Sequence, residues 1–113
     1  MGKVREVFIY GQYFWDFYHQ RSLKVQERFD WMIKTIECIQ VIPEKYFKHI
    51  TGTDLYEIRI SSGNNIFRVF CFFDAGRVIV VLNGFQKKTQ KTPLNDIAKA
   101  LRLKKQYYEN KKK

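Results

Sequence analysis

Two arginines lie in neighbouring β-prone stretches, and their spacing indicates an anion-binding site. Arg59 lies within 55–60 and Arg68 within 66–73, and both stretches read as strands. The residues between them, Ser-Ser-Gly-Asn-Asn, are typical of a hairpin turn. A turn centred on 63–64 places Arg59 directly opposite Arg68. Like charges in that arrangement repel each other, so the pairing makes sense if an anion binds there.

A third strand extends this row toward a basic loop. Residues 78–82 are all apolar, as in a strand at the middle of a sheet that is covered on both faces. A two-residue turn before this strand would place Asn83 opposite Arg68. The row of two arginines and Asn83 would then point toward Lys87 and Lys88. We expect the two guanidinium groups to share one face, open to solvent, and to bind a phosphate.

Arg68 also has a purely structural interpretation. It interrupts an apolar strand, where a charge is costly unless it is paired. Glu57 lies two residues before Arg59, on the same face of the strand, and is the natural ion-pair partner. The two interpretations are compatible, because Glu57 can hold the arginines until a substrate arrives. The planar fork of arginine suits phosphate oxygens, so an arginine pair favours a phosphodiester.

The overall charge favours an acidic partner. The chain has 113 residues, enough for one small domain with a single core, and its net charge is +10. Residues 86–113 carry most of the excess, with nine Lys and one Arg against Asp96 and Glu109. Such a balance most often marks nucleic-acid binding, and a basic tail that aids solubility is the alternative.

No metal or cofactor site is expected. His19 and His49 are far apart in the sequence, and neither has a ligand at helical spacing. Cys38 and Cys71 read as small buried residues in a helix and a central strand. The chain shows no glycine-rich phosphate loop, no signal peptide and no apolar run that could span a membrane. We therefore expect a cytoplasmic protein that does not bind membranes.

The elements around the arginine pair predict an α+β domain with the order β-α-α-β-β-β-α. A strand is expected at 5–10 and an aromatic helix at 13–20. Ser22 can cap a second helix over about 23–41, whose apolar residues recur at helical spacing. Residues 44–53 read as a connecting segment. This arrangement would place both N-terminal helices before the three strands that carry the charged row.

A last helix follows the basic loop. Thr92 is expected as its N-cap and Pro93 as its first helical residue. Helical spacing marks the face that this helix should bury: Leu94, Ile97, Ala98, Leu101 and Tyr108. Neither a linker nor a repeat interrupts the chain, so residues 1–113 are expected to form one domain.

Several of these segments together resemble a known family. The match includes strand residues 55–59 and 68–70 and the segment 83–93, and it continues into the last helix. Its most specific part is Gly-Phe-Gln-Lys-Lys-Thr-Gln-Lys-Thr-Pro. The pattern resembles the phage-derived, HigB-like branch of the RelE/ParE toxin superfamily of bacterial toxin–antitoxin systems. The resemblance implies a RelE-like fold, with two N-terminal helices on one face of an antiparallel sheet and a short C-terminal helix.

The same resemblance implies an activity and its partners. Such toxins cut mRNA in the ribosomal A site without a metal or cofactor, and they inhibit translation. An antitoxin, in this branch usually a helix-turn-helix DNA-binding protein, neutralises them. The implied partners are therefore mRNA, ribosomal RNA and a cognate antitoxin. The protein would be a monomer or part of a toxin–antitoxin hetero-oligomer.

Four basic residues match the family's functional positions. Arg59 and Arg68 fall on its basic strand positions, and Lys87 and Lys88 fall on its basic loop. In RelE-type toxins such residues bind the scissile phosphate and stabilise negative charge while the 2′-hydroxyl attacks. The resemblance thus implies that these four residues form the catalytic site.

The proton-transfer residues depart from the family pattern. Asn83 stands where many relatives have histidine, and Glu57 stands where RelE has a lysine. Asn83 can orient a group or donate a hydrogen bond, but it cannot act as a base. Glu57, Lys87 and Lys88 all remain candidates for the general base, and the general acid is also open.

Two other functions fit the same resemblance. The chain could be a ParE-like protein that inhibits DNA gyrase, in which case the basic row would be structural or would contact gyrase. It could also be a degenerate relative that only binds its antitoxin or RNA. The basic row on the sheet favours RNA cleavage over both alternatives.

Overall fold

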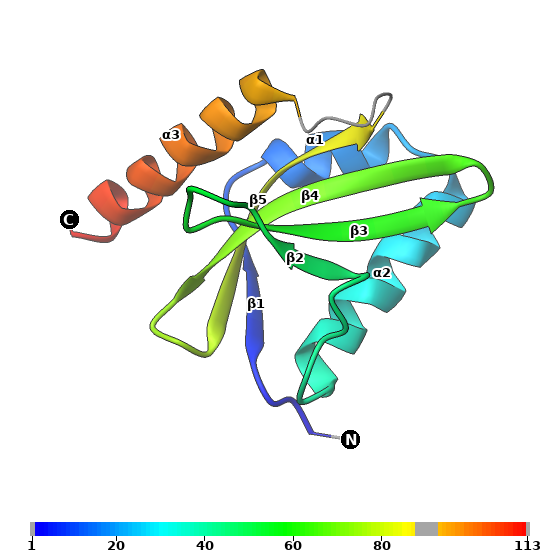
Figure 1. The fold of residues 1–113 in the computed structure, drawn as a ribbon, viewed down its shortest axis with the longest axis horizontal. Coiled ribbons are helices and arrows are strands. Elements are labelled where there is room, and N and C mark those ends of the chain that lie inside the picture. The colour runs from blue at the N-terminus through cyan, green and yellow to red at the C-terminus, as the bar shows by residue number, and fades with distance from the viewer. Residues whose placement is uncertain (1, 88–92, 113) are drawn as a thin grey trace.

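The computed structural model describes residues 2–87 and 93–112, and it shows a five-stranded sheet with helices on both faces (Figure 1). The elements in chain order are β1 (Glu6–Ile9), α1 (Tyr13–His19), α2 (Leu23–Cys38), β2 (Phe47–His49), β3 (Tyr56–Ser62), β4 (Asn65–Asp74), β5 (Val78–Lys87) and α3 (Leu94–Lys111).

The sheet has the strand order β1-β5-β4-β3-β2. Strand β5 lies inside the sheet between β1 and β4, and Ile79 to Leu82 are fully buried, which confirms the expectation of an interior strand covered on both faces. Strand β1 pairs parallel with β5, whereas every other pairing is antiparallel. The sheet is therefore mixed rather than purely antiparallel, and the predicted α+β class is confirmed.

The two faces of the sheet carry separate cores. Successive strand residues point to opposite faces, and Phe70 and Cys71 in β4 show this directly. Cys71 packs in a cluster with Phe29 and Met32 of α2, together with Phe14 of α1. Phe70 packs instead with residues of α3. The two N-terminal helices thus share one face, as predicted, and α3 covers part of the other.

Helix α2 begins as expected and ends early. The Ser22 side chain accepts a hydrogen bond from the Val25 amide at 3.3 Å, which confirms the predicted cap. The helix ends at Cys38 rather than near residue 41. Ile39 has an extended backbone, and the guanidinium of Arg5 donates to carbonyl groups in and just after the last turn: Ile36, Ile39 and Gln40. Expected core positions are buried: Val25, Phe29, Met32 and Ile36.

Strand β2 was not predicted. Residues 44–53 were expected to be a connecting segment, yet Phe47–His49 pair with β3, and Lys48 lies opposite Glu57. A strand this short has no periodicity to recognise, and it exists because β3 offers an edge for it to pair with. The amide of Arg59 also bonds to the carbonyl of Tyr46 at 2.8 Å, and this bond extends the contact by one residue.

The two hairpins differ in how well their register was predicted. Ser62 pairs with Asn65, and Arg59 lies opposite Arg68, as the turn residues indicated. The β4–β5 turn has three residues rather than two, with positive φ at Ala75 (56°) and Gly76 (77°).

An irregularity between Val69 and Cys71 shifts the β4–β5 register once more. Arg68 therefore lies opposite Phe85, and the predicted pairing of Arg68 with Asn83 is wrong.

Helix α3 packs Ile97 against the core as expected, but the rest of its buried face differs from the prediction. Ala100 and Leu103 are buried, with Ile97 and Tyr107 packed beside them, whereas Leu94 is 81% exposed. Leu101 and Tyr108 also remain exposed. The expected N-cap, Thr92, lies outside the described residues, and Pro93 takes the N-cap position instead of the first helical one. With 18 residues, α3 is longer than the short helix implied by the resemblance.

Within residues 2–87 and 93–112, none of the helices combines the length and the apolar character that a membrane span requires.

Candidate functional site

The structure brings Arg59 and Arg68 together on one face of the sheet. They occupy directly opposed positions on the antiparallel strands β3 and β4. Ile58 and Ile60 flank Arg59 and pack in the core under α2. Because side chains alternate along a strand, both arginines point to the other face, the one that α3 partly covers.

The Glu57 carboxylate bridges the two guanidinium groups. Its Oε1 lies 3.1 Å from Nε of Arg59 and 3.4 Å from Nε of Arg68. The ion pair expected from the sequence is therefore present, and it includes both arginines. The Arg68 contact is a charge contact without hydrogen-bond geometry, and Nε of Arg68 and Oε2 of Glu57 have no hydrogen-bond partner among the described residues. Glu57 thus keeps one buried oxygen free of the arginines.

The two arginines differ in exposure. The side chain of Arg59 is 29% exposed, and that of Arg68 only 7%. The expectation of two solvent-open guanidinium groups is therefore wrong for Arg68, which lies between Arg59 on one neighbouring strand and Phe85 on the other. Burial lowers the pKa of Arg68; the Glu57 carboxylate opposes this effect and the Arg59 charge adds to it.

Lys87 joins the same cluster from the end of β5. It lies two residues beyond Phe85 and so points to the same face as Arg68. Burial and the nearby Arg68 charge lower the pKa of Lys87, and the Glu57 carboxylate works in the opposite direction. The charges of Arg59 and Lys48 lower this pKa further. Lys88 lies outside the described residues.

Lys48 is a member of the cluster that the sequence did not reveal. It lies in β2 directly opposite Glu57, and its charge acts on Lys87. No sequence signal identified it, because the strand that positions it went unrecognised. Four strands thus supply one basic cluster around a single buried carboxylate, and we call this set of Lys48, Glu57, Arg59, Arg68 and Lys87 the cationic cluster.

The cationic cluster opens into a pocket at the edge of the sheet. This pocket has a volume of about 430 Å³, and Arg59 and Arg68 contribute to its lining. It extends over the edge of β3 toward α2 and the residues before β2. Although Arg68 is largely buried, it therefore still borders a space that a ligand can enter.

Comparison with known proteins matches residues 17–105 to the family described as phage-derived protein Gp49-like (DUF891). This match covers well over half of the chain. The chain belongs to the Gp49-like family. That family is the HigB-like branch of the RelE/ParE toxins, whose members are typically ribonucleases and have a cognate antitoxin. No curated protein matches the chain significantly.

The whole cationic cluster of this Gp49-like protein falls inside the matched region. Asn83 also falls inside it, but the structure gives Asn83 a different position from the one expected. It is buried, and its Nδ2 donates to the backbone carbonyl of Asp96 in the first turn of α3 at 3.3 Å. Asn83 therefore ties β5 to α3 rather than completing a row with the arginines.

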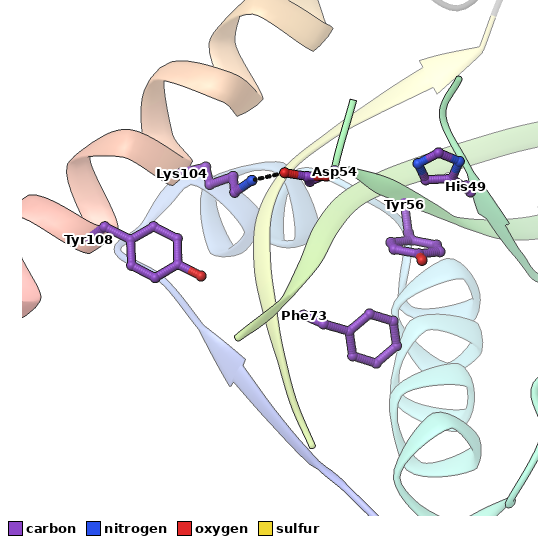
Figure 2. A pocket seen from close by; sticks show the side chains of 6 residues that line it. All are labelled: His49, Asp54, Tyr56, Phe73, Lys104 and Tyr108. Atoms are coloured by element: carbon purple, nitrogen blue, oxygen red, sulfur yellow. Dashed lines mark hydrogen bonds and ion pairs between the residues drawn. The ribbon is translucent and has the colours of Figure 1, made fainter. Parts of the chain in front are cut away.

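A second pocket of the Gp49-like protein lies at the other end of β3. It has a volume of about 300 Å³, and Figure 2 shows the side chains that line it. Tyr56 and Phe73 line it from the sheet and Tyr108 from α3. Lys104 of α3 forms an ion pair with Asp54 at 3.2 Å beside it. The pocket contains no member of the cationic cluster, so it is a separate feature.

The two cysteines lie in a helix and a strand, as expected. Nowhere in the part of the chain that the structure describes do three or more His, Cys, Asp or Glu side chains gather as they would around a metal ion. Cys71 is fully buried as expected, and burial raises the pKa of its thiol. Cys38, at the end of α2, is only half-buried, so the expectation of burial holds for one of the two.

Proposed function

We propose that this Gp49-like toxin is an endoribonuclease that cuts mRNA in the ribosomal A site and thereby inhibits translation. The observation that carries the proposal is the direct opposition of Arg59 and Arg68 beside Lys87, on a face that opens into a pocket. A phosphodiester is the RNA group that such a concentration of cations would bind.

The arginines would hold the scissile phosphate. Negative charge grows on the phosphate oxygens as the 2′-hydroxyl attacks, and donors positioned in advance stabilise that charge most effectively. Glu57 fixes both guanidinium groups before the substrate arrives, because each lies within 3.4 Å of the same carboxylate oxygen. The positive charge that a metal supplies in other nucleases would come here from side chains.

Glu57 and Lys87 are the residues to which we assign proton transfer. The 2′-oxygen forms a bond to phosphorus and its proton passes to the Glu57 carboxylate; because Oε2 is buried and accepts no hydrogen bond from the arginines, this side chain must turn toward the substrate. The bond from phosphorus to the 5′-oxygen breaks, and Lys87 donates a proton to that oxygen. The products are a 2′,3′-cyclic phosphate and a 5′-hydroxyl. Because burial and neighbouring cations lower the pKa of Lys87, it would release its proton more readily than an ordinary lysine.

The rest of the chain would position the substrate and partners. The lysine-rich 86–113 region would contact ribosomal RNA, and Asn83 would position α3 against β5. We further propose a helix-turn-helix protein as the cognate antitoxin. Because the target is the ribosome, the proposed activity is cytoplasmic.

Inducible expression in bacteria tests the proposal. The wild-type protein should arrest growth and fragment translated mRNA, whereas Arg68→Ala should cut about 10²–10³-fold more slowly because one phosphate donor is lost. Arg77→Ala is the matched control, since Arg77 is exposed in the β4–β5 turn at the far end of the hairpin. Thermal unfolding of each purified variant verifies that it folds.

Two outcomes would reject this function. If wild-type expression leaves mRNA intact but damages DNA, the ParE-like inhibition of gyrase takes its place. If expression affects neither growth nor mRNA, and Arg68→Ala behaves like the wild type, the protein is a binding protein without nuclease activity.

A further inference from the structure

We propose that the pocket beside the arginine pair binds one unstacked base of the mRNA substrate, next to the phosphate that is cut. The inference rests on the proposed function. It assigns a base of the substrate to the pocket, in addition to the phosphate that is assigned to the arginines. Arg59 and Arg68 belong both to the cationic cluster and to the pocket lining. A phosphate held by them would therefore leave its own nucleotide or the adjacent one at the mouth of the pocket.

The lining has the composition that a nucleobase requires. Met32, from the buried face of α2, and Ile66, at the start of β4, supply apolar surface. Tyr46 supplies an aromatic ring, and aromatic rings stack on bases whatever their sequence. The volume of about 430 Å³ falls within the roughly 300–1,000 Å³ of pockets that bind small molecules.

The position of the Tyr46 ring supports this assignment. The exposed Lys45 places its Nζ 4.9 Å from the ring centroid, so a face of the ring already accepts a cation at the pocket. Trp31 of α2 contacts the ring edge-on, at 6.3 Å between centroids, and thereby fixes its orientation. A base that stacks on that ring would take the place of the exposed Lys45 ammonium.

The surrounding charge selects for a nucleic acid over an apolar ligand. Arg28 and Lys45 line the pocket together with the two arginines of the cluster, so four cations surround its apolar surface. Nε of Arg28 donates to the carbonyl of Ser61 at 3.2 Å, which satisfies the unpaired edge of β3 at this point. The four cations and the apolar lining together suit a polyanion that carries flat apolar groups.

The consequence is a nucleotide preference at the cut site. We test it with purified ribosomes programmed with mRNAs that differ in a single base next to the cut, and with kcat/KM measured for all four bases. Tyr46→Ala should lower kcat/KM on the preferred base by about tenfold, the order of one base-stacking contact, and should flatten the ratio between bases. Tyr46→Phe keeps the ring and should keep the ratio.

A second variant tests the same pocket in case Tyr46→Ala does not fold. Ile66 is 38% exposed, so Ile66→Trp should fold while filling the pocket, and it should flatten the base ratio in the same way. Tyr108→Ala is the matched control, because it removes an exposed tyrosine ring that lines the other pocket (Figure 2). This control should leave the base ratio of the wild type unchanged.

The outcomes separate the inference from the proposed function. If Arg68→Ala abolishes cleavage while Tyr46→Ala and Ile66→Trp leave the base ratio unchanged, the pocket does not bind the base and the nuclease remains. If the two pocket variants bind ribosomes more weakly but keep the base ratio of the wild type, the inference is also overturned. The pocket would then bind ribosomal RNA rather than a base of the mRNA. If the wild type cuts no template, the proposed function fails, and the inference fails with it.

Discussion

At the scale of single residues, the carboxylate of Glu57 is what makes the arginine pair stable. Two guanidinium groups on opposed strand positions would repel each other, and Arg68 is almost completely buried. A buried charge is tolerated only when it is paired. Glu57 is buried as well, and its Oε1 faces both arginines. The pairing lets the strands hold the cations close together while no substrate is bound.

Lys87 provides a prediction about pH. An acid acts only in its protonated form, and the pKa of Lys87 is lowered, so cleavage should decline as the pH rises through that lowered value. Lys87→Arg keeps the charge, but arginine hardly releases its proton. We expect this variant to cut about 10²–10⁴-fold more slowly and to lose the decline at alkaline pH.

The measurement is kcat between pH 6 and pH 10, with uncatalysed RNA hydrolysis subtracted at each point. Lys24→Arg serves as the control, since Lys24 is an exposed lysine in the first turn of α2 that is assigned no part in binding or proton transfer. If Lys87→Arg keeps both the full rate and the decline at alkaline pH, Lys87 is not the residue that donates the proton to the 5′-oxygen.

At the scale of elements, the contact between α1 and β5 depends on a residue without a side chain. A Cβ atom added to Gly84 would lie 2.6 Å from Cδ2 of Phe17, far inside normal contact. Gly84 lies opposite Val69, next to the irregularity that sets the register of Arg68 with Phe85. Gly84 therefore allows the close packing of α1 on the sheet, and it lies beside the irregularity that positions Arg68.

Gly84→Ala should destabilise the fold. The Phe17 ring would have to move within the core, and such overpacking costs about 1–3 kcal/mol. Denaturant unfolding followed by circular dichroism measures the change in the free energy of unfolding. Gly2→Ala is the control, because a Cβ there meets nothing within 4 Å and should change stability by less than about 0.5 kcal/mol. Equal stabilities for the two variants would contradict the packing argument.

At the scale of the whole molecule, Asp74 joins the sheet to the end of α3. Its carboxylate accepts hydrogen bonds from Tyr107 at 2.6 Å, Tyr108 at 3.4 Å and Lys111 at 2.6 Å. The bonds from Lys111 and Tyr107 lower the pKa of Asp74 below its ordinary value, although burial opposes the shift. These contacts anchor the C-terminal half of the helix, whereas Asn83 anchors its first turn.

The lowered pKa of Asp74 predicts how acid affects stability. An Asp whose pKa is lower in the folded state stabilises the protein fully above its unfolded value of about 3.9, and this contribution is lost as the pH falls through the folded pKa. Asp74→Asn should lower the melting temperature at pH 7 by several degrees and lose less stability than the wild type below pH 4.

Melting curves between pH 2 and pH 7 check this prediction. Asp54→Asn is the matched control, because the Asp54 side chain is 88% exposed and its ion pair with Lys104 should contribute little. Parallel curves for Asp74→Asn and the wild type below pH 4 would show that Asp74 does not anchor α3 through its charge.

The sequence by itself determined the part of the site that depends on local geometry. A short turn between two alternating stretches leaves one favourable register, so the opposition of Arg59 and Arg68 followed from the turn residues. The alternation of strand side chains placed Glu57 on the same face and predicted its ion pair with Arg68. Capping by Ser22 and the buried face of α2 are equally local, and both were predicted.

Only the tertiary structure decided the features that depend on contacts between distant segments. Strand β2 and its Lys48 exist because β3 has an edge to pair with. The position of Asn83 depends on a turn with positive φ at Ala75 and on an irregularity next to Val69, and residue types alone do not specify either. Helix α3 offers two apolar stripes, and packing against β4 and β5 selected the one that contains Ala100. Burial of Arg68 depends on the same β4–β5 register, because that register places Phe85 beside it.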